Sequence, residues 1–190
     1  MRRGVDTGGI EPLWKFKIRS PNAQFGVRYQ AIDERELVDA VNFLHVETPQ
    51  LTFVDLGCGK GRALLVASEL GFGKVIGVEF ASELVDIAKA NLAKMRIAGA
   101  VVVHADAGDF QFPATDMVVY LYNPFSKEVL QRVLTNLRKC VCSALYVIYK
   151  APRCAKLLDS CGFLRRVGCP PGVEDLQIWR AIGHHESEVS

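Results

Sequence analysis

From residue 51 onward, short apolar runs alternate with longer segments whose apolar residues recur at helical spacing. Five runs have the length and composition of buried strands: 51–56, 74–78, 100–104, 116–122 and 143–149. Three intervening segments place apolar side chains along one helical face: 61–70, 82–95 and 126–139. Strands separated by helices of this length form parallel sheets with helices on both faces, and continuously apolar strands suit burial on both sides.

The two ends of this region extend the pattern. Residues 33–46 carry apolar side chains at helical spacing, and Asp33 is in position to cap that helix. Residues 152–161 suit a short helix, whereas 163–167 and 176–182 suit strands with no room for a helix between them. We therefore expect an α/β fold with a mostly parallel seven-stranded sheet and an antiparallel C-terminal hairpin at one edge.

The length and composition suit one folded unit. A chain of 190 residues, 49% of them hydrophobic, can build one domain with a sizeable core. Residues 1–32 are irregular, with Gly, Pro and Asn scattered among aromatic residues, and we interpret them as an arm or lid. The domain is expected to span 33–184, and 185–190 to form a tail.

The charge, the apolar runs and the cysteines bear on which partners, metal sites and compartment we expect for this protein. The formal net charge of +2 makes no overall electrostatic case for nucleic acid or an anionic membrane. The segment from Arg132 to Arg166 is locally basic, which leaves nucleic acid open as a partner. No apolar run approaches the roughly 20 residues of a membrane span, and no secretory pattern follows Met1. We therefore expect no membrane partner and a cytoplasmic location. The six cysteines form no C-x-x-C pair, so we expect reduced thiols and no metal site.

A glycine loop (residues 57–61, Gly-Cys-Gly-Lys-Gly) joins the first apolar strand to its helix. Glycines there let the backbone turn sharply and let a ligand touch the main chain, at a strand end where α/β folds bind ligands. The spacing is G-x-G-x-G, whereas loops that grip a pyrophosphate read G-x-G-x-x-G. Asp55 adds a negative charge that would repel a pyrophosphate and would suit a ligand with an ammonium group. The alternative is a tight turn needed only for packing.

Glu79 ends the second strand, about 20 residues after the first glycine of the loop. An acid at this offset accepts hydrogen bonds from ribose hydroxyls, and Phe80 beside it could pack on an adenine face. The alternative is that Glu79 only precedes the next helix, where an acid is favoured and Ser82 is expected to be the cap. The glycine loop at this spacing favours the ribose role.

Asp106 and Ala107 lie just past the third strand, in the segment His-Ala-Asp-Ala-Gly-Asp-Phe. A carboxylate at this strand end can accept a hydrogen bond from an adenine amino group. Asp109 competes for that role, and ordinary turn chemistry would also explain both acids.

Taken in order, these motifs resemble those of the class I S-adenosylmethionine-dependent methyltransferases. VDLGCGKGR resembles the first motif of that family, VIGVEF the second and HADAGDF the acidic motif after the third strand, within a resemblance that extends from residue 35 to 182. The N-terminal RGVDTGG also resembles the start of a group of small bacterial members. The resemblance implies a three-layer Rossmann-like methyltransferase fold with S-adenosyl-L-methionine as the cofactor.

The same resemblance assigns cofactor-binding residues. It implies that the ribose lies on Glu79 and the adenine on Asp106. It places the methionine part of the cofactor on Asp55, Gly57, Gly59 and Gly61. Their neighbours complete the expected cofactor-binding set: Cys58, Phe80 and Ala107.

The fourth strand is followed by Asn123, Pro124 and Phe125, where this family faces the methyl acceptor. The segment resembles the Asn/Asp-Pro-Pro-aromatic motif of enzymes that methylate amino nitrogens, although it has one proline instead of two. We therefore expect these three residues to be catalytic, with an amino nitrogen of a protein or small molecule as acceptor. A simple Asn-Pro turn is the alternative.

Other functions share part of this pattern. An NAD-dependent oxidoreductase would share the sheet and the ribose-binding acid, but the loop spacing and Asp55 argue against it. A non-catalytic S-adenosylmethionine-binding adaptor would keep the loop and Glu79 and lose methyl transfer. A nucleic-acid methylase fits the near-neutral charge less well. The predicted function is accordingly methyl transfer from S-adenosyl-L-methionine to an unidentified acceptor.

Overall fold

The computed structural model describes residues 5–8, 10–11, 29–30, 32–122, 125–140 and 142–182. Its helices are α1 (Glu34–Phe43), η3 (Thr48–Gln50), α2 (Arg62–Glu69), α3 (Ser82–Lys94), η4 (Ala107–Asp109), α4 (Lys127–Arg138) and α5 (Ala155–Ser160). Its strands are β1 (Ile10–Glu11), β2 (Tyr29–Gln30), β3 (Thr52–Leu56), β4 (Lys74–Glu79), β5 (Ala100–His104), β6 (Met117–Tyr122), β7 (Leu145–Lys150), β8 (Leu164–Gly168) and β9 (Leu176–Ala181).

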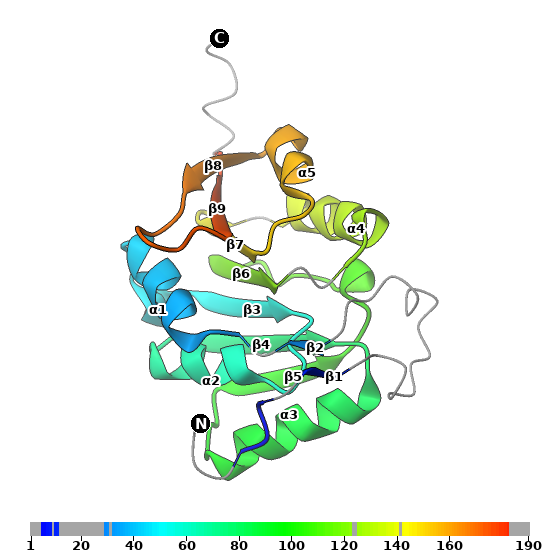
Figure 1. Ribbon diagram of the computed structural model, residues 1–190. Helices are drawn as coiled ribbons and strands as arrows, with labels where there is room; N and C mark the ends of the chain where they lie inside the picture. Colours follow the sequence, from blue (N-terminus) through cyan, green and yellow to red (C-terminus); the bar gives the residue numbers. More distant parts are fainter. Residues whose placement is uncertain are drawn as a thin grey trace.

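Seven of these strands form one sheet in the order β5-β4-β3-β6-β7-β9-β8 (Figure 1). The strands from β5 to β7 pair in parallel, whereas β9 pairs antiparallel with both β7 and β8. The predicted α/β fold, with a mostly parallel seven-stranded sheet and an antiparallel C-terminal edge, is confirmed. The short antiparallel pair of β1 and β2 lies outside that sheet and was not predicted.

Two packed layers of helices sandwich the sheet. Leu64 of α2 belongs to a core cluster that also holds buried residues of α1 and α3, whereas Leu130 of α4 belongs to a second cluster that includes α5. Successive residues of β3 alternate between them, because Phe53 joins the first cluster and Val54 the second. Burial on both faces explains why the strands are apolar along their whole length.

The strand order reverses between β3 and β6, which places the candidate site. The chain enters the sheet at β3, adds β4 and β5 on one side and then returns to add β6 on the other. Ligands of doubly wound sheets bind outside the carboxyl ends of the strands at such a reversal. The glycine loop follows β3 at this point, and the neighbouring strand β6 ends at Tyr122.

Two sequence-based expectations concern the ends of the domain. Asp33 caps α1 as predicted, because its Oδ1 accepts a hydrogen bond of 2.9 Å from the Arg35 amide. The division into an arm (1–32), a domain (33–184) and a tail (185–190) stays a prediction. None of the helices within the described ranges combines the length and the apolar character needed to cross a membrane.

Candidate functional site

The glycine loop depends on a backbone conformation that favours glycine. Gly57, Gly59 and Gly61 have φ angles of 81°, 53° and 83°, in the left-handed region where a Cβ atom is strained. Gly61 is also the N-cap of α2, so the loop leads directly into the N-terminus of that helix. The amides of Gly57 and Cys58 both donate to the Val78 carbonyl, at 2.8 and 3.0 Å, and thereby tie the loop to β4.

Cys58 serves the packing beneath the loop. Its side chain is 5% exposed, and burial raises the pKa of its thiol, which stays neutral. A Cβ atom on Gly77 of β4 would lie 2.7 Å from the Cys58 Sγ, so the thiol occupies space that the glycine leaves open. The role of Cys58 as a cofactor contact stays a prediction.

The Glu79 carboxylate joins the glycine loop to the start of α3. Its Oε2 accepts from the Gly59 amide at 2.9 Å, and its Oε1 accepts from the amides of Phe80 and Ala81 at 3.0 and 2.9 Å. Burial raises the pKa of this carboxyl, and the three amide donors oppose that rise. An ionised carboxylate has about four acceptor positions, so one remains for a donor such as a ribose hydroxyl.

The expectation that Ser82 caps α3 is wrong. The N-cap residue is Ala81, and no side chain caps this helix. The Ser82 hydroxyl donates instead to Glu83 Oε2 at 3.1 Å. Glu79 satisfies the two amides just before the helix, so it acts at the helix start and on the glycine loop together.

Asp55 is the second buried acid of the site and differs from Glu79 in its surroundings. It is 4% exposed, next to Gly77 and Tyr120 on the neighbouring strands. Burial, followed by the negative charge of Glu79, raises its pKa to about 8. None of the described residues donates a hydrogen bond to its carboxylate. A ligand that carries positive charge would supply what this carboxylate lacks.

The acids predicted to meet the adenine occupy the turn after β5. Asp106 Oδ1 accepts from the Gly108 amide at 2.8 Å and so caps η4, which is the turn chemistry considered as the alternative. Asp109 forms an ion pair with Arg132 of α4, and its side chain is 68% exposed. This pairing disfavours Asp109 as the adenine acceptor, whereas the adenine role of Asp106 and Ala107 stays a prediction.

The predicted acceptor side is described in part. Asn123 and Pro124 lie outside the described residues, and Phe125 is partly buried against the core cluster on the α4 side of the sheet. At the neighbouring strand end, Lys150 Nζ pairs with Glu36 Oε1 of α1 at 2.9 Å. This pair could not be found from the sequence, because its members are separated by 114 positions and share no motif.

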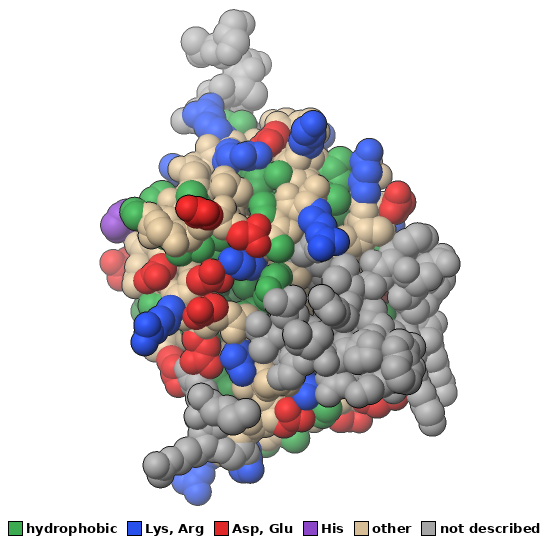
Figure 2. Space-filling view, viewed as in Figure 1, with side chains coloured by type: hydrophobic (Ala, Val, Ile, Leu, Met, Phe, Trp, Pro, Cys, Tyr) green, Lys and Arg blue, Asp and Glu red, His purple; other side chains and the backbone are tan. Residues whose placement is uncertain are grey.

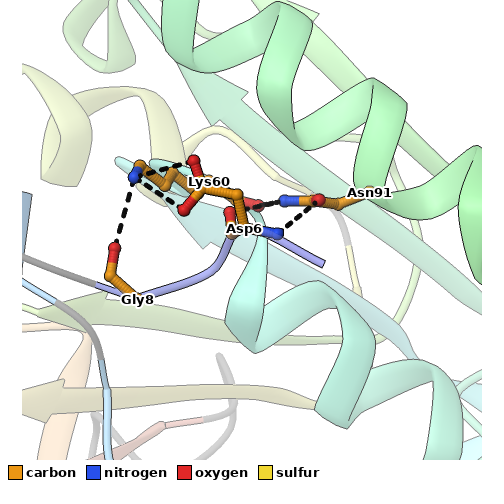
Figure 3. A network of polar contacts seen from close by, with 4 residues as sticks. All are labelled: Asp6, Gly8, Lys60 and Asn91. Atoms are coloured by element: carbon orange, nitrogen blue, oxygen red, sulfur yellow. Dashed lines mark hydrogen bonds and ion pairs between the residues drawn. The ribbon is translucent and has the colours of Figure 1, made fainter. Parts of the chain in front are cut away.

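A second network that the sequence analysis missed fastens the N-terminus to the glycine loop (Figure 3). Lys60 is 6% exposed, and its Nζ donates to both carboxylate oxygens of Asp6 and to the Gly8 carbonyl. Asn91 of α3 bonds to the backbone of Asp6 and of Lys60. A lysine inside a glycine loop that opens a buried helix is the signal that could have found it, because a buried ammonium needs a partner.

Charge on the surface is mixed. On the face shown in Figure 2, acidic side chains gather over α1, and basic ones lie mainly toward α5 and the β8–β9 edge. No group of three or more His, Cys, Asp or Glu side chains within the described ranges is placed to hold a metal ion.

Comparison with known proteins agrees with this fold and loop. Residues 53–143 match a protein family described as a methyltransferase domain. Over 79 residues the chain is 29% identical to MJ0284, an uncharacterized protein of Methanocaldococcus jannaschii, and the match covers 42% of this chain and 36% of that relative. The chain therefore spans about a third of the length of this relative.

Two solved structures share the architecture over most of the chain. A candidate RNA methyltransferase of Pyrococcus horikoshii, PH1948, is 20% identical with a TM-score of 0.61, over 95% of this chain and 92% of that one. A candidate methylase of Haemophilus influenzae, HI0767, is 19% identical with a TM-score of 0.61, over 78% and 98%. These identities show a shared fold. Together with the family match over residues 53–143, they confirm the resemblance to the class I methyltransferases.

Proposed function

We propose that this protein transfers a methyl group from S-adenosyl-L-methionine, bound on the glycine loop, to an amino nitrogen of a protein or small molecule. The observation that carries the proposal is the buried Asp55 carboxylate, which has no hydrogen-bond donor among the described residues and lies beside Glu79. The methionine part of this cofactor brings an ammonium and a sulfonium group, whose positive charge would favour the ionised form of Asp55.

The same observation disfavours a dinucleotide. A pyrophosphate at the loop would meet the buried Glu79 carboxylate with like charge, and it would further oppose the ionisation of Asp55, whose pKa is already raised to about 8. Lys60, the cation of the loop, is engaged by Asp6 and Gly8 and so is not directed at a phosphate. An NAD-dependent oxidoreductase is therefore the weaker reading of this site.

The cofactor supplies a methyl group that is already activated by the sulfonium. The protein then has to hold the cofactor and the acceptor in line and exclude water, and orientation of this kind can contribute about 7–11 kcal/mol to the rate. We assign the methionine part to Asp55 and the glycine loop, the ribose to Glu79, and the adenine to Asp106 with Phe80 and Ala107 beside it.

We assign the acceptor to Asn123, Pro124 and Phe125, at the end of the neighbouring strand β6. The amide oxygen of Asn123 would accept a hydrogen bond from the amine, and the ring of Phe125 would favour the ammonium that develops. The proposed compartment is the cytoplasm, because all six cysteines are unpaired and thiols persist in reducing compartments.

Methyl transfer from S-adenosylmethionine labelled in its methyl group, into fractionated cell lysate, tests this proposal. We expect label in protein or in small amines with the wild-type chain, and none with Gly59→Val, which strains the loop at its φ of 53°. Gly99→Val is the matched control, because nothing lies within 4 Å of a Cβ atom at that position. Label confined to RNA would overturn the amine assignment, and no transfer into any fraction would contradict methyl transfer.

A further inference from the structure

The N-terminal strap (residues 5–8) provides three acceptors for the Lys60 ammonium. Its Nζ lies 2.9 and 3.1 Å from the two carboxylate oxygens of Asp6 and 3.2 Å from the Gly8 carbonyl oxygen. An ammonium has three N–H donors, and acceptors from the strap lie within hydrogen-bond distance of them. The Lys60 side chain is 7% exposed and the Asp6 side chain 63%, so a buried ammonium meets a carboxylate at the surface (Figure 3).

Asn91 connects the strap to the loop through hydrogen bonds to the backbone of each. Its Nδ2 donates to the Asp6 carbonyl at 2.8 Å and to the Lys60 carbonyl at 3.0 Å, while its Oδ1 accepts from the Asp6 amide at 3.1 Å. Asn91 is 5% exposed, so a partner that moved away would leave buried polar groups unpaired. The strap, the loop and α3 are thus joined by one buried network.

A second contact beside the same loop joins Arg62 to Ile32, which lies just before α1. Arg62, the first residue of α2, donates from its guanidinium to the Ile32 carbonyl at 3.2 Å. Lys60 and Arg62 flank Gly61. The residues on both sides of that glycine therefore bond to segments that precede α1: the strap and Ile32.

This network acts on the peptide units that the cofactor would touch. Gly59, just before Lys60, is held from the other side by Glu79, and Gly61, just after it, begins α2. Asp6 also matches the Lys60 charge, so Lys60 does not act as the counterion of Asp55 or Glu79. We propose, on the basis of the function proposed above, that Asp6 is a positioning residue of the cofactor site: through Lys60 it fixes the glycine loop, and its charge balances that of Lys60 near the cationic cofactor.

The two parts of this role separate in a comparison of two ligands. S-adenosylmethionine carries a sulfonium, whereas its product S-adenosylhomocysteine has a neutral sulfur. Asp6→Asn keeps the shape of the side chain and removes its charge, so the Lys60 cation near the loop loses the Asp6 counterion. We expect Asp6→Asn to weaken S-adenosylmethionine binding about tenfold and S-adenosylhomocysteine binding less, so that the ratio of the two affinities falls.

Lys60→Met provides the complementary change. It removes the cation and keeps an apolar stem, so the ratio should stay at or above its wild-type value even though the strap is released. Combining it with Asp6→Asn should restore the ratio, which a purely structural role of Asp6 would not do. Asp86→Asn, at an exposed acid of the same helix that carries Asn91, is the matched control and should change neither affinity.

Calorimetric titration of both ligands into the full chain tests the inference, with thermal unfolding as a check that each variant is folded. If Asp6→Asn binds both ligands as the wild type does, the inference is wrong and the proposed function stands. If that variant does not fold, a fall of the ratio in Lys60→Met overturns the inference and an unchanged or raised ratio supports it. If the wild-type chain binds neither ligand, the proposed function fails and the inference fails with it.

Discussion

The affinity for S-adenosylmethionine should rise steeply with pH below 8, because the Asp55 carboxyl has to lose its proton to meet the cationic cofactor. Burial and the charge of Glu79 raise its pKa to about 8 from an ordinary value of 3.8. At neutral pH, the ligand-free protein therefore holds Asp55 mostly in its protonated, neutral form. Binding of a cation would stabilise the ionised form and release that proton.

The size of the effect follows from this pKa. With a value of about 8, roughly one Asp55 carboxyl in ten is ionised at pH 7 and roughly one in a hundred at pH 6. If the cofactor binds the ionised form, its dissociation constant should weaken about tenfold for each pH unit below 8. The ammonium of the ligand stays charged below pH 7, because an α-amino group titrates near about 8.

Calorimetry at pH 6 and 7, in buffers of different ionisation enthalpy, measures both the change of affinity and the released proton. Asp55→Asn is the control, because it keeps the shape of the side chain and should bind weakly with no dependence on pH. A wild-type affinity that is equal at pH 6 and pH 7 would refute the electrostatic reasoning.

The stability of the ligand-free protein should change in the opposite direction. The fold raises the Asp55 pKa, so the contribution of this group to stability is fully present below pH 4 and is lost as the pH rises toward 8. Thermal unfolding should therefore show the wild type losing stability relative to Asp55→Asn over this range. A constant difference between the two proteins would contradict the raised pKa.

Three further changes have expected outcomes. Gly77→Ala should destabilise the fold by about 1–3 kcal/mol in thermal or denaturant unfolding, because its Cβ atom would lie 2.7 Å from the Cys58 Sγ. Gly99→Ala is the control and should not destabilise the fold, because the space around that position is open. Glu79→Gln should weaken S-adenosylhomocysteine binding at least about tenfold in calorimetry, because an amide nitrogen would face amide donors that now meet carboxylate oxygens; wild-type affinity would argue against its ribose role. Asn123→Ala should lower kcat about a hundredfold and leave the dissociation constant of S-adenosylhomocysteine unchanged, and a selective loss of cofactor affinity would contradict its place on the acceptor side.

The order of strands and helices could be predicted because each element has a recognisable pattern of apolar residues within its own short segment. Each apolar run, such as 51–56, has the length of a strand and is followed by helical spacing, so the parallel sheet follows from the chain order. The late hairpin could be predicted for the same reason, since 163–167 and 176–182 leave no room for a helix. The pair of β1 and β2 could not, because each strand contains only two residues.

The candidate site shows where local patterns stop being informative. The glycine loop and Glu79 follow from spacing, but the bond from the Gly59 amide to Glu79 depends on two strand ends that become neighbours in the sheet. Lys60 and Asp6 are separated by 54 positions, so no motif links them. The expectation about Ser82 is wrong because a carboxylate from the preceding strand satisfies the amides at that helix start.

Separate titrations of S-adenosylhomocysteine and NADH test the central claim most directly. We predict that S-adenosylhomocysteine binds the wild-type chain in calorimetric titration with a dissociation constant of about a micromolar or tighter, a binding free energy of about −8 kcal/mol. We predict that NADH gives no binding heat under the same conditions, because its pyrophosphate would face Asp55 and Glu79. Binding of NADH without binding of S-adenosylhomocysteine would contradict the account.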